Sequence, residues 1–160
     1  MSRAYHLRSV SAAALTYDPD WLAAQFADDW DDLQSLCAVH LAGVLQQDFA
    51  DVDRLYTAPG QDRAGSLPVL GGRTVPHHDG RLPPFAVLTP PGVKEAAAFL
   101  IGVSFDSLWQ AVRTELTAPY GSRVPESEVR EHFSRTHEGL AGFYARAAHE
   151  ERSVVKWLLL

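Results

Sequence analysis

The sequence predicts a helix-rich α+β fold: a single domain over residues 1–160, with a small mixed or antiparallel sheet that includes N- and C-terminal strands. Runs with helical apolar spacing recur along the chain, and a few short β-type segments lie between them, far apart in sequence. This alternation is typical of the α+β class, in which helices cover one small sheet. A length of 160 residues fits one ordinary domain, and no linker separates two self-sufficient cores.

Three segments have the residue pattern of strands. Residues 3–10 alternate large and polar side chains, which places Tyr5 and Leu7 on the same face of a strand. Residues 85–88 form a short apolar run bounded by prolines, which is typical of a buried strand. Residues 153–160 close the chain with a β-type run, so we expect the C-terminus to be held in the sheet.

Helices are predicted where a capping residue or a proline precedes a run with helical apolar spacing. Four starts fit this pattern: Asp18-Pro19, Thr89-Pro90, Ser104 and Pro125. Residues 11–15 are rich in alanine and predict a short helix of their own.

Residues 33–47 predict a further helix, because their apolar side chains repeat every three and four positions. Cys37 and His40 both lie on the apolar stripe of this expected helix. Residues three apart share a helix face, so the two side chains are expected to reach one site.

Residues 57–84 are the least regular part of the chain. Glycine and proline recur throughout them, which predicts a long loop region with one short strand at residues 67–70. Long loops in compact domains often carry function.

Composition excludes several classes of partner. The chain has 14 basic and 20 acidic residues and a net charge of −6, so we expect neither nucleic acid nor an anionic membrane to be a partner. The single cysteine, Cys37, excludes an internal disulfide and fits a reducing compartment. No stretch has the apolar length of a secretory signal or a membrane span, so we expect a cytoplasmic protein.

Two stretches resemble a known family when they are taken together and in order. Residues 85–97 resemble a strand that leads through leucine, threonine and proline into a helix, and residues 143–148 resemble a phenylalanine, tyrosine and alanine helix that leads into a terminal strand at residues 154–158. Both features are similar to the YfbM-like bacterial family, domain of unknown function 1877, and the second half of the chain matches better than the first. The resemblance implies a small α+β fold without an established activity. It also aligns His40 with the family's second histidine, and Cys37 with the position of its first.

The leading functional hypothesis is a non-catalytic domain that binds another protein or a small molecule. Four aspartates surround one tryptophan at the start of a predicted helix, and two adjacent histidines lie in the long loop. We expect the binding face to combine this acidic segment with residues 57–84, through Asp28, Asp29, Trp30, Asp31, Asp32, His77 and His78. No cofactor is implied, and a homo-oligomer built on the C-terminal helix stays open.

The alternative hypothesis is a small enzyme with a polar pocket around His40 and Cys37, reached by His77 or His78 from the loop. A neighbouring imidazole can convert a thiol into a nucleophilic thiolate. An enzyme predicts that Cys37 and His40 face an open cavity with a third polar group nearby, whereas a binding domain predicts that both are closed in the core.

No metal site is predicted from the sequence. His77 and His78 are adjacent to Asp79, but neighbouring side chains of an extended chain point in different directions, and no rigid partner is evident. The acidic run from Asp28 to Asp32 lacks the glycine and the closing glutamate of a calcium loop.

Overall fold

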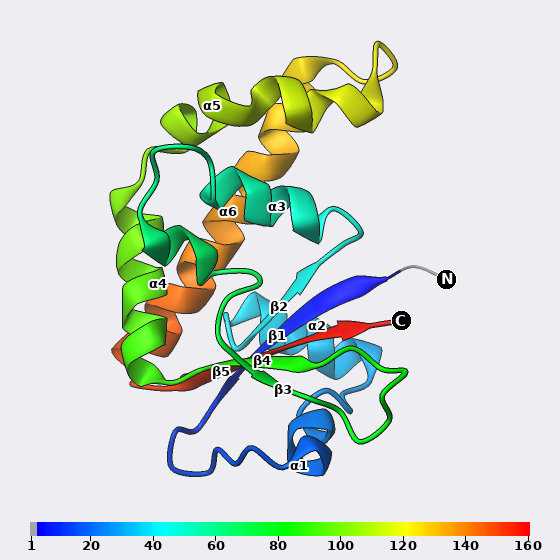
Figure 1. The fold of residues 1–160 in the computed structure, drawn as a ribbon, viewed down its shortest axis with the longest axis vertical. Coiled ribbons are helices and arrows are strands. Elements are labelled where there is room, and N and C mark those ends of the chain that lie inside the picture. The colour runs from blue at the N-terminus through cyan, green and yellow to red at the C-terminus, as the bar shows by residue number, and fades with distance from the viewer. Residues whose placement is uncertain (1–2) are drawn as a thin grey trace.

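The structure is a computed structural model that describes residues 3–160, and its centre is a five-stranded sheet (Figure 1). The strand order is β2-β1-β5-β4-β3, and every neighbouring pair is antiparallel. The strands are β1 (Ala4–Val10), β2 (Ala42–Leu45), β3 (Arg73–Val75), β4 (Phe85–Leu88) and β5 (Ser153–Leu159). The expected α+β class with terminal strands in an antiparallel sheet is therefore confirmed.

Helices cover both faces of this sheet unequally. Helices α3 to α6 gather on one side, whereas α1 lies on the other (Figure 1). The helices are α1 (Pro19–Ala24), α2 (Trp30–Ala38), α3 (Phe49–Tyr56), α4 (Pro90–Gly102), α5 (Phe105–Thr117) and α6 (Glu126–His149), with 3₁₀ turns η1 (Arg63–Ser66) and η2 (Ala118–Tyr120).

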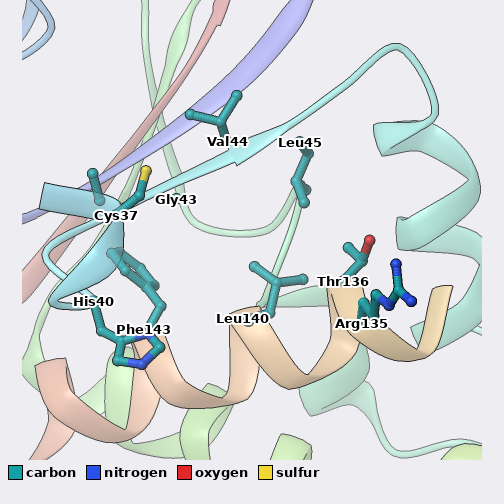
Figure 2. A pocket seen from close by; sticks show the side chains of 11 residues that line it. Cys37, His40, Gly43, Val44, Leu45, Arg135, Thr136, Leu140 and Phe143 are labelled. Atoms are coloured by element: carbon teal, nitrogen blue, oxygen red, sulfur yellow. The ribbon is translucent and has the colours of Figure 1, made fainter. Parts of the chain in front are cut away.

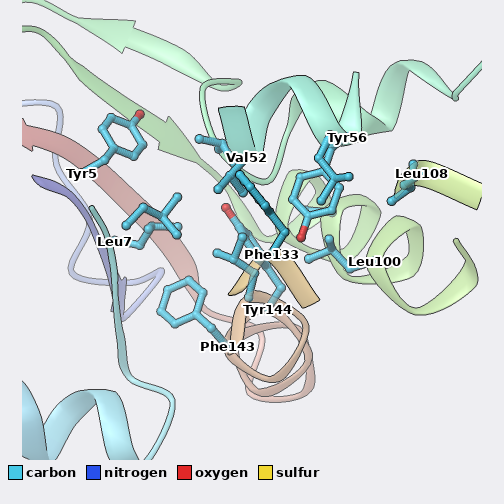
Figure 3. Close-up of a cluster of buried hydrophobic side chains, with 14 of the residues drawn as sticks. Tyr5, Leu7, Val52, Tyr56, Leu100, Leu108, Phe133, Phe143 and Tyr144 are labelled. Atoms are coloured by element: carbon cyan, nitrogen blue, oxygen red, sulfur yellow. The ribbon is translucent and has the colours of Figure 1, made fainter. Parts of the chain in front are cut away.

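The alternation of side chains along the strands produces two apolar cores. Tyr5 and Leu7 of β1 point to the larger core, where they meet aromatic side chains such as Phe143 and Tyr144 of α6 (Figure 3). Val10, on the opposite face of β1, belongs to the smaller core under α1. The predicted common face for Tyr5 and Leu7 is confirmed.

Local sequence signals placed most element starts correctly. The Asp18 carboxylate accepts a hydrogen bond from the Asp20 amide at 3.1 Å and caps α1. The Ser104 hydroxyl caps α5 in the same way, and α6 begins directly after Pro125. Thr89 stands at the N-cap of α4 without a side-chain cap bond.

The predicted helix over residues 33–47 is wrong. Helix α2 ends at Ala38, and the chain turns through His40 before it enters β2. The His40 amide donates to the Cys37 carbonyl and the Leu41 amide to the Leu36 carbonyl, which is the Schellman arrangement of a helix end. The apolar spacing over residues 33–47 therefore comes from two short elements, α2 and β2, and not from one helix.

Two shorter predictions also fail. Residues 11–15 form an isolated turn, in which the amides of Ala14 and Leu15 share the Ser11 carbonyl. Residues 67–70 are not a strand but part of a tight turn that the bond from the Gly71 amide to the Ser66 carbonyl closes at 2.7 Å. The α3 helix was not predicted by the sequence.

The expected long loop is in fact well tied to the core. The Lys156 ammonium group donates to the Leu67 carbonyl at 2.6 Å, and the Tyr144 hydroxyl donates to the Pro68 carbonyl at 2.7 Å. Both side chains are fully buried, so these bonds satisfy polar groups that have no access to water. Desolvation lowers the pKa of Lys156 to about 7, against the opposing effect of the Asp53 charge.

This buried lysine predicts a distinctive pH dependence of stability. The unfolded chain keeps Lys156 protonated up to its ordinary pKa of 10.5, whereas the folded chain holds that proton only below about 7. The free energy of unfolding should therefore rise with pH between these values, by at most about 1.4 kcal/mol per pH unit. Urea unfolding between neutral pH and about pH 9 measures this slope.

The only other lysine supplies the control. We expect Lys156→Met to remove the rise, and Lys94→Met to leave it intact because Lys94 is exposed. An unchanged slope in Lys156→Met would show that another group is responsible.

Candidate functional site

A cavity of about 350 Å³ lies between strand β2 and helix α6, and Cys37 and His40 stand at one end of it (Figure 2). This volume is large enough for a small ligand or a short peptide segment. Its principal side chains are Cys37, His40, Leu45, Arg135, Thr136, Leu140 and Phe143. The cavity thus joins the end of α2, the β2 strand and two turns of α6.

His40 is held in an unusual backbone conformation at this end of the cavity. Its φ angle is +60°, in the left-handed region that glycine normally occupies at the end of a Schellman motif. Its ring packs on Gly142 of α6, where a Cβ atom would stand only 2.7 Å from the His40 Cε1 atom. Gly142 therefore makes room for the imidazole, and Arg146 of α6 donates to the Val39 carbonyl beside it.

Cys37 does not have the properties of an activated nucleophile. Its side chain is half-buried, and burial raises the pKa of the thiol, although Arg8 has an opposing effect. The thiol therefore stays protonated at neutral pH. Among residues 3–160, no hydrogen bond joins Cys37 to His40.

The other end of the cavity carries Arg135 and Thr136. The Arg135 guanidinium donates to Glu131 at 2.6 Å and is largely exposed, so it can turn toward a bound acidic group. Arg135 lies seven residues before Gly142, which corresponds to about 10 Å along the helix. Leu140 stands between the two ends (Figure 2). The cavity is therefore elongated, apolar in the middle and polar at its ends.

Strand β2 borders this cavity with an open edge. The Ser9 amide bonds to the Leu41 carbonyl, so the alternation of an antiparallel ladder directs the main-chain groups of Gly43 toward β1 and those of Val44 away from it. The main-chain groups of Ala42 also point away from β1, but Ala42 is almost fully buried, whereas Val44 is half-buried. Val44 thus offers one N–H and one C=O to a further strand.

The opposite edge of the sheet is protected. Strand β3 has only three residues, and Pro76, which has no amide hydrogen, follows it directly. The Arg73 guanidinium lies over the Tyr17 ring at 3.9 Å and ties this edge to the segment before α1. Strand β2 has neither a proline nor a charged side chain within it.

The acidic segment before and within α2 is exposed, but half of it has a structural role. The Asp28 carboxylate accepts a hydrogen bond from the buried Arg8 at 3.0 Å. Asp29 caps α2 by accepting from the Asp32 amide at 2.8 Å. Trp30 is 67 % exposed, the second largest exposed fraction among the large apolar side chains of the described residues. Asp31 is exposed in the first turn of α2.

His77 and His78 lie beside α1 and do not line the cavity. The His77 ring stacks on Trp157 with centroids 5.7 Å apart, and His78 faces Asp18 and Asp20. The predicted binding face, which combined Asp28 to Asp32 with all of residues 57–84, does not form as one surface. Residues 76–84 lie on the α1 side of the sheet, whereas residues 57–70 pack on the larger core.

Comparison with known proteins identifies the family. The model of the family described as domain of unknown function DUF1877 matches residues 1–157. The chain belongs to the DUF1877 family. The resemblance noted in the second half of the chain therefore extends over almost all of it.

A solved structure supports the same fold. The crystal structure of YfbM from Escherichia coli, a protein of unknown function, has a TM-score of 0.56 and 10 % identity, covering 99 % of this chain and 100 % of that chain. At this identity the likeness concerns the fold alone. No curated protein matches this chain. No helix among the described residues is long and apolar enough to cross a membrane.

Each sequence hypothesis finds one of its expected features in this DUF1877 protein. Cys37 and His40 face an open cavity, as the enzyme alternative required, but the further polar groups Arg135 and Thr136 lie at its other end and not beside them. The acidic segment is exposed, as the binding hypothesis required, but Cys37 and His40 are not closed in the core. Sequence reasoning missed Arg135, Thr136 and the β2 edge, because it placed residues 33–47 in one helix.

The protonated thiol predicts slow chemistry at Cys37. We expect iodoacetamide to alkylate Cys37 in the folded protein more slowly than free cysteine at neutral pH, because burial raises its pKa and restricts access. Mass spectrometry over time measures the rate, and the urea-unfolded protein serves as the control. Alkylation faster than that of free cysteine would indicate an activated thiolate.

The left-handed residues predict a matched pair of stabilising substitutions. His40 and Glu151 both have positive φ angles, +60° and +52°, at the ends of α2 and α6. His40→Gly and Glu151→Gly should each stabilise the fold by about 1 kcal/mol, because glycine adopts this region without a steric cost. Thermal and urea unfolding test both variants, and destabilisation of both would contradict this account.

Proposed function

We propose that this protein is a non-catalytic binding domain that holds an extended polypeptide segment along the open edge of β2. The observation that carries the proposal is the coincidence of this edge with the elongated cavity of about 350 Å³ beside it. An added strand obtains affinity from main-chain hydrogen bonds and specificity from pockets for alternate side chains. The edge and the cavity supply these two parts side by side.

The main-chain part of the proposed recognition centres on Val44. Its outward N–H and C=O can exchange two hydrogen bonds with one residue of an incoming strand. An unprotected edge is normally avoided in soluble proteins, which supports a functional reason for this one.

The side-chain part follows from the lining of the cavity. Leu45, Leu140 and Phe143 offer apolar contact for one side chain of the bound segment. Arg135 at the mouth is suited to an acidic side chain or a terminal carboxylate. At about 3.3 Å per residue, the distance between the two polar ends corresponds to about three residues of an extended chain.

A catalytic role receives less support from the same site. The enzyme alternative requires a thiolate at Cys37, and burial acts against that ionisation. Among the described residues that line the cavity, Cys37 and Arg135 are the only titratable groups besides His40, and Arg135 lies at the other end. We also propose a cytoplasmic location, which the single half-buried thiol supports.

Peptide display tests the proposal directly. A library of random ten-residue peptides is selected against the folded protein, and enriched peptides are measured by fluorescence anisotropy against two variants at one position. Val44→Pro removes the outward amide without removing a hydrogen bond to β1, and Val44→Ala keeps that amide. We expect Val44→Pro to weaken binding by about tenfold or more, and Val44→Ala to change it little.

A second variant tests the cavity. Gly139 lines the cavity and a Cβ atom there meets open space, so Gly139→Trp places an indole in the cavity from a position that tolerates a side chain. We expect this variant to lose the selected peptides. Peptides that bind Val44→Pro and Gly139→Trp as tightly as the native protein would contradict the proposal, and so would a selection that enriches no peptide.

A further inference from the structure

Three metal-ligating side chains from two separate segments meet at the start of α1. The Nε2 atom of His78 lies 3.6 Å from a carboxylate oxygen of Asp20 and 4.0 Å from one of Asp18. The three candidate ligand atoms all lie within 4.8 Å of one another. His78 comes from the segment after β3, 58 positions beyond Asp20 in the numbering, so the fold and not the local sequence brings them together.

Both segments are fixed by contacts outside this cluster. On one side, the Arg73 guanidinium over the Tyr17 ring ties β3 to the residue before Asp18. On the other side, His77, the residue before His78, stacks its ring on Trp157 of β5 at an interplanar angle of 4°. The two backbones that carry the ligands are therefore held by the sheet.

We propose that Asp18, Asp20 and His78 bind one divalent transition-metal ion, with Zn²⁺ as the best match. Ligand atoms about 2.0–2.1 Å from a tetrahedral ion are about 3.3 Å apart, so small side-chain rotations from the observed separations complete the site. Water fills the fourth position, because all three side chains are exposed.

The donor set determines which ion is preferred. One imidazole nitrogen with two carboxylate oxygens suits Zn²⁺, whereas Mg²⁺ and Ca²⁺ prefer oxygen ligands alone. The Asp18 carboxylate oxygen that faces His78 also accepts the cap bond from the Asp20 amide, so this ligand is already oriented toward the site. This inference does not depend on peptide binding at β2, since the cluster lies on the α1 side of the sheet.

Titration of the whole protein with Zn²⁺ tests the proposal. Isothermal calorimetry measures stoichiometry and affinity, and amide NMR shifts locate the ion. We expect one saturable Zn²⁺ site, with the largest amide shifts at residues 18–20 and 77–79. Millimolar Mg²⁺ should not displace the bound Zn²⁺. His78→Ala and Asp20→Asn should each weaken binding by about tenfold or more.

A second histidine supplies the matched control. His132 is also exposed and lies 2.5 Å from a carboxylate oxygen of Asp48, but the described residues give it only this one acidic partner. His132→Ala should leave the affinity unchanged. The proposal is overturned if Zn²⁺ does not saturate, if His78→Ala binds as tightly as the native protein, or if His132→Ala weakens binding as much.

Discussion

The strand that ends the chain is the middle strand of the sheet, and the rest of the structure depends on this placement. Strand β5 pairs with β1 on one side and with β4 on the other, so the two halves of the sheet meet only through it. Lys156 of β5 also reaches the Leu67 carbonyl and holds residues 67–70 against the larger core. With the terminus in the centre, β2 and β3 become the two edges, and both candidate sites lie beside them.

The sequence predicted the elements whose boundaries have a local chemical signal. Asp18, Ser104 and Pro125 marked helix starts because their side chains or ring act within one turn. The end of α2 had no such signal, since His40 occupies the left-handed position where glycine is usual. The predicted helix therefore continued through the residues of β2. As a result, the sequence did not predict this strand, its open edge or the shape of the cavity beside it.

The two sheet edges show why the candidate sites were harder to predict than the fold. The β2 cavity requires the end of α2, with Cys37 and His40, to lie beside α6, with Arg135 and Thr136, and the α1 cluster requires His78 to approach Asp18. Both contacts span many residues and depend on strand order, which no local pattern specifies. The sequence identified His40, Cys37 and His78 as chemically interesting, but the partners came from the tertiary structure.

Hydrogen exchange at the Val44 amide tests the central claim most directly, because that single group distinguishes an edge that accepts a strand from one that does not. The measurement compares amide exchange by NMR in the free protein and with a selected peptide bound. The account predicts fast exchange of Val44 in the free protein and strong protection in the complex, while Gly43, already bonded toward β1, changes little. A tightly bound peptide that leaves the Val44 amide unprotected would contradict it.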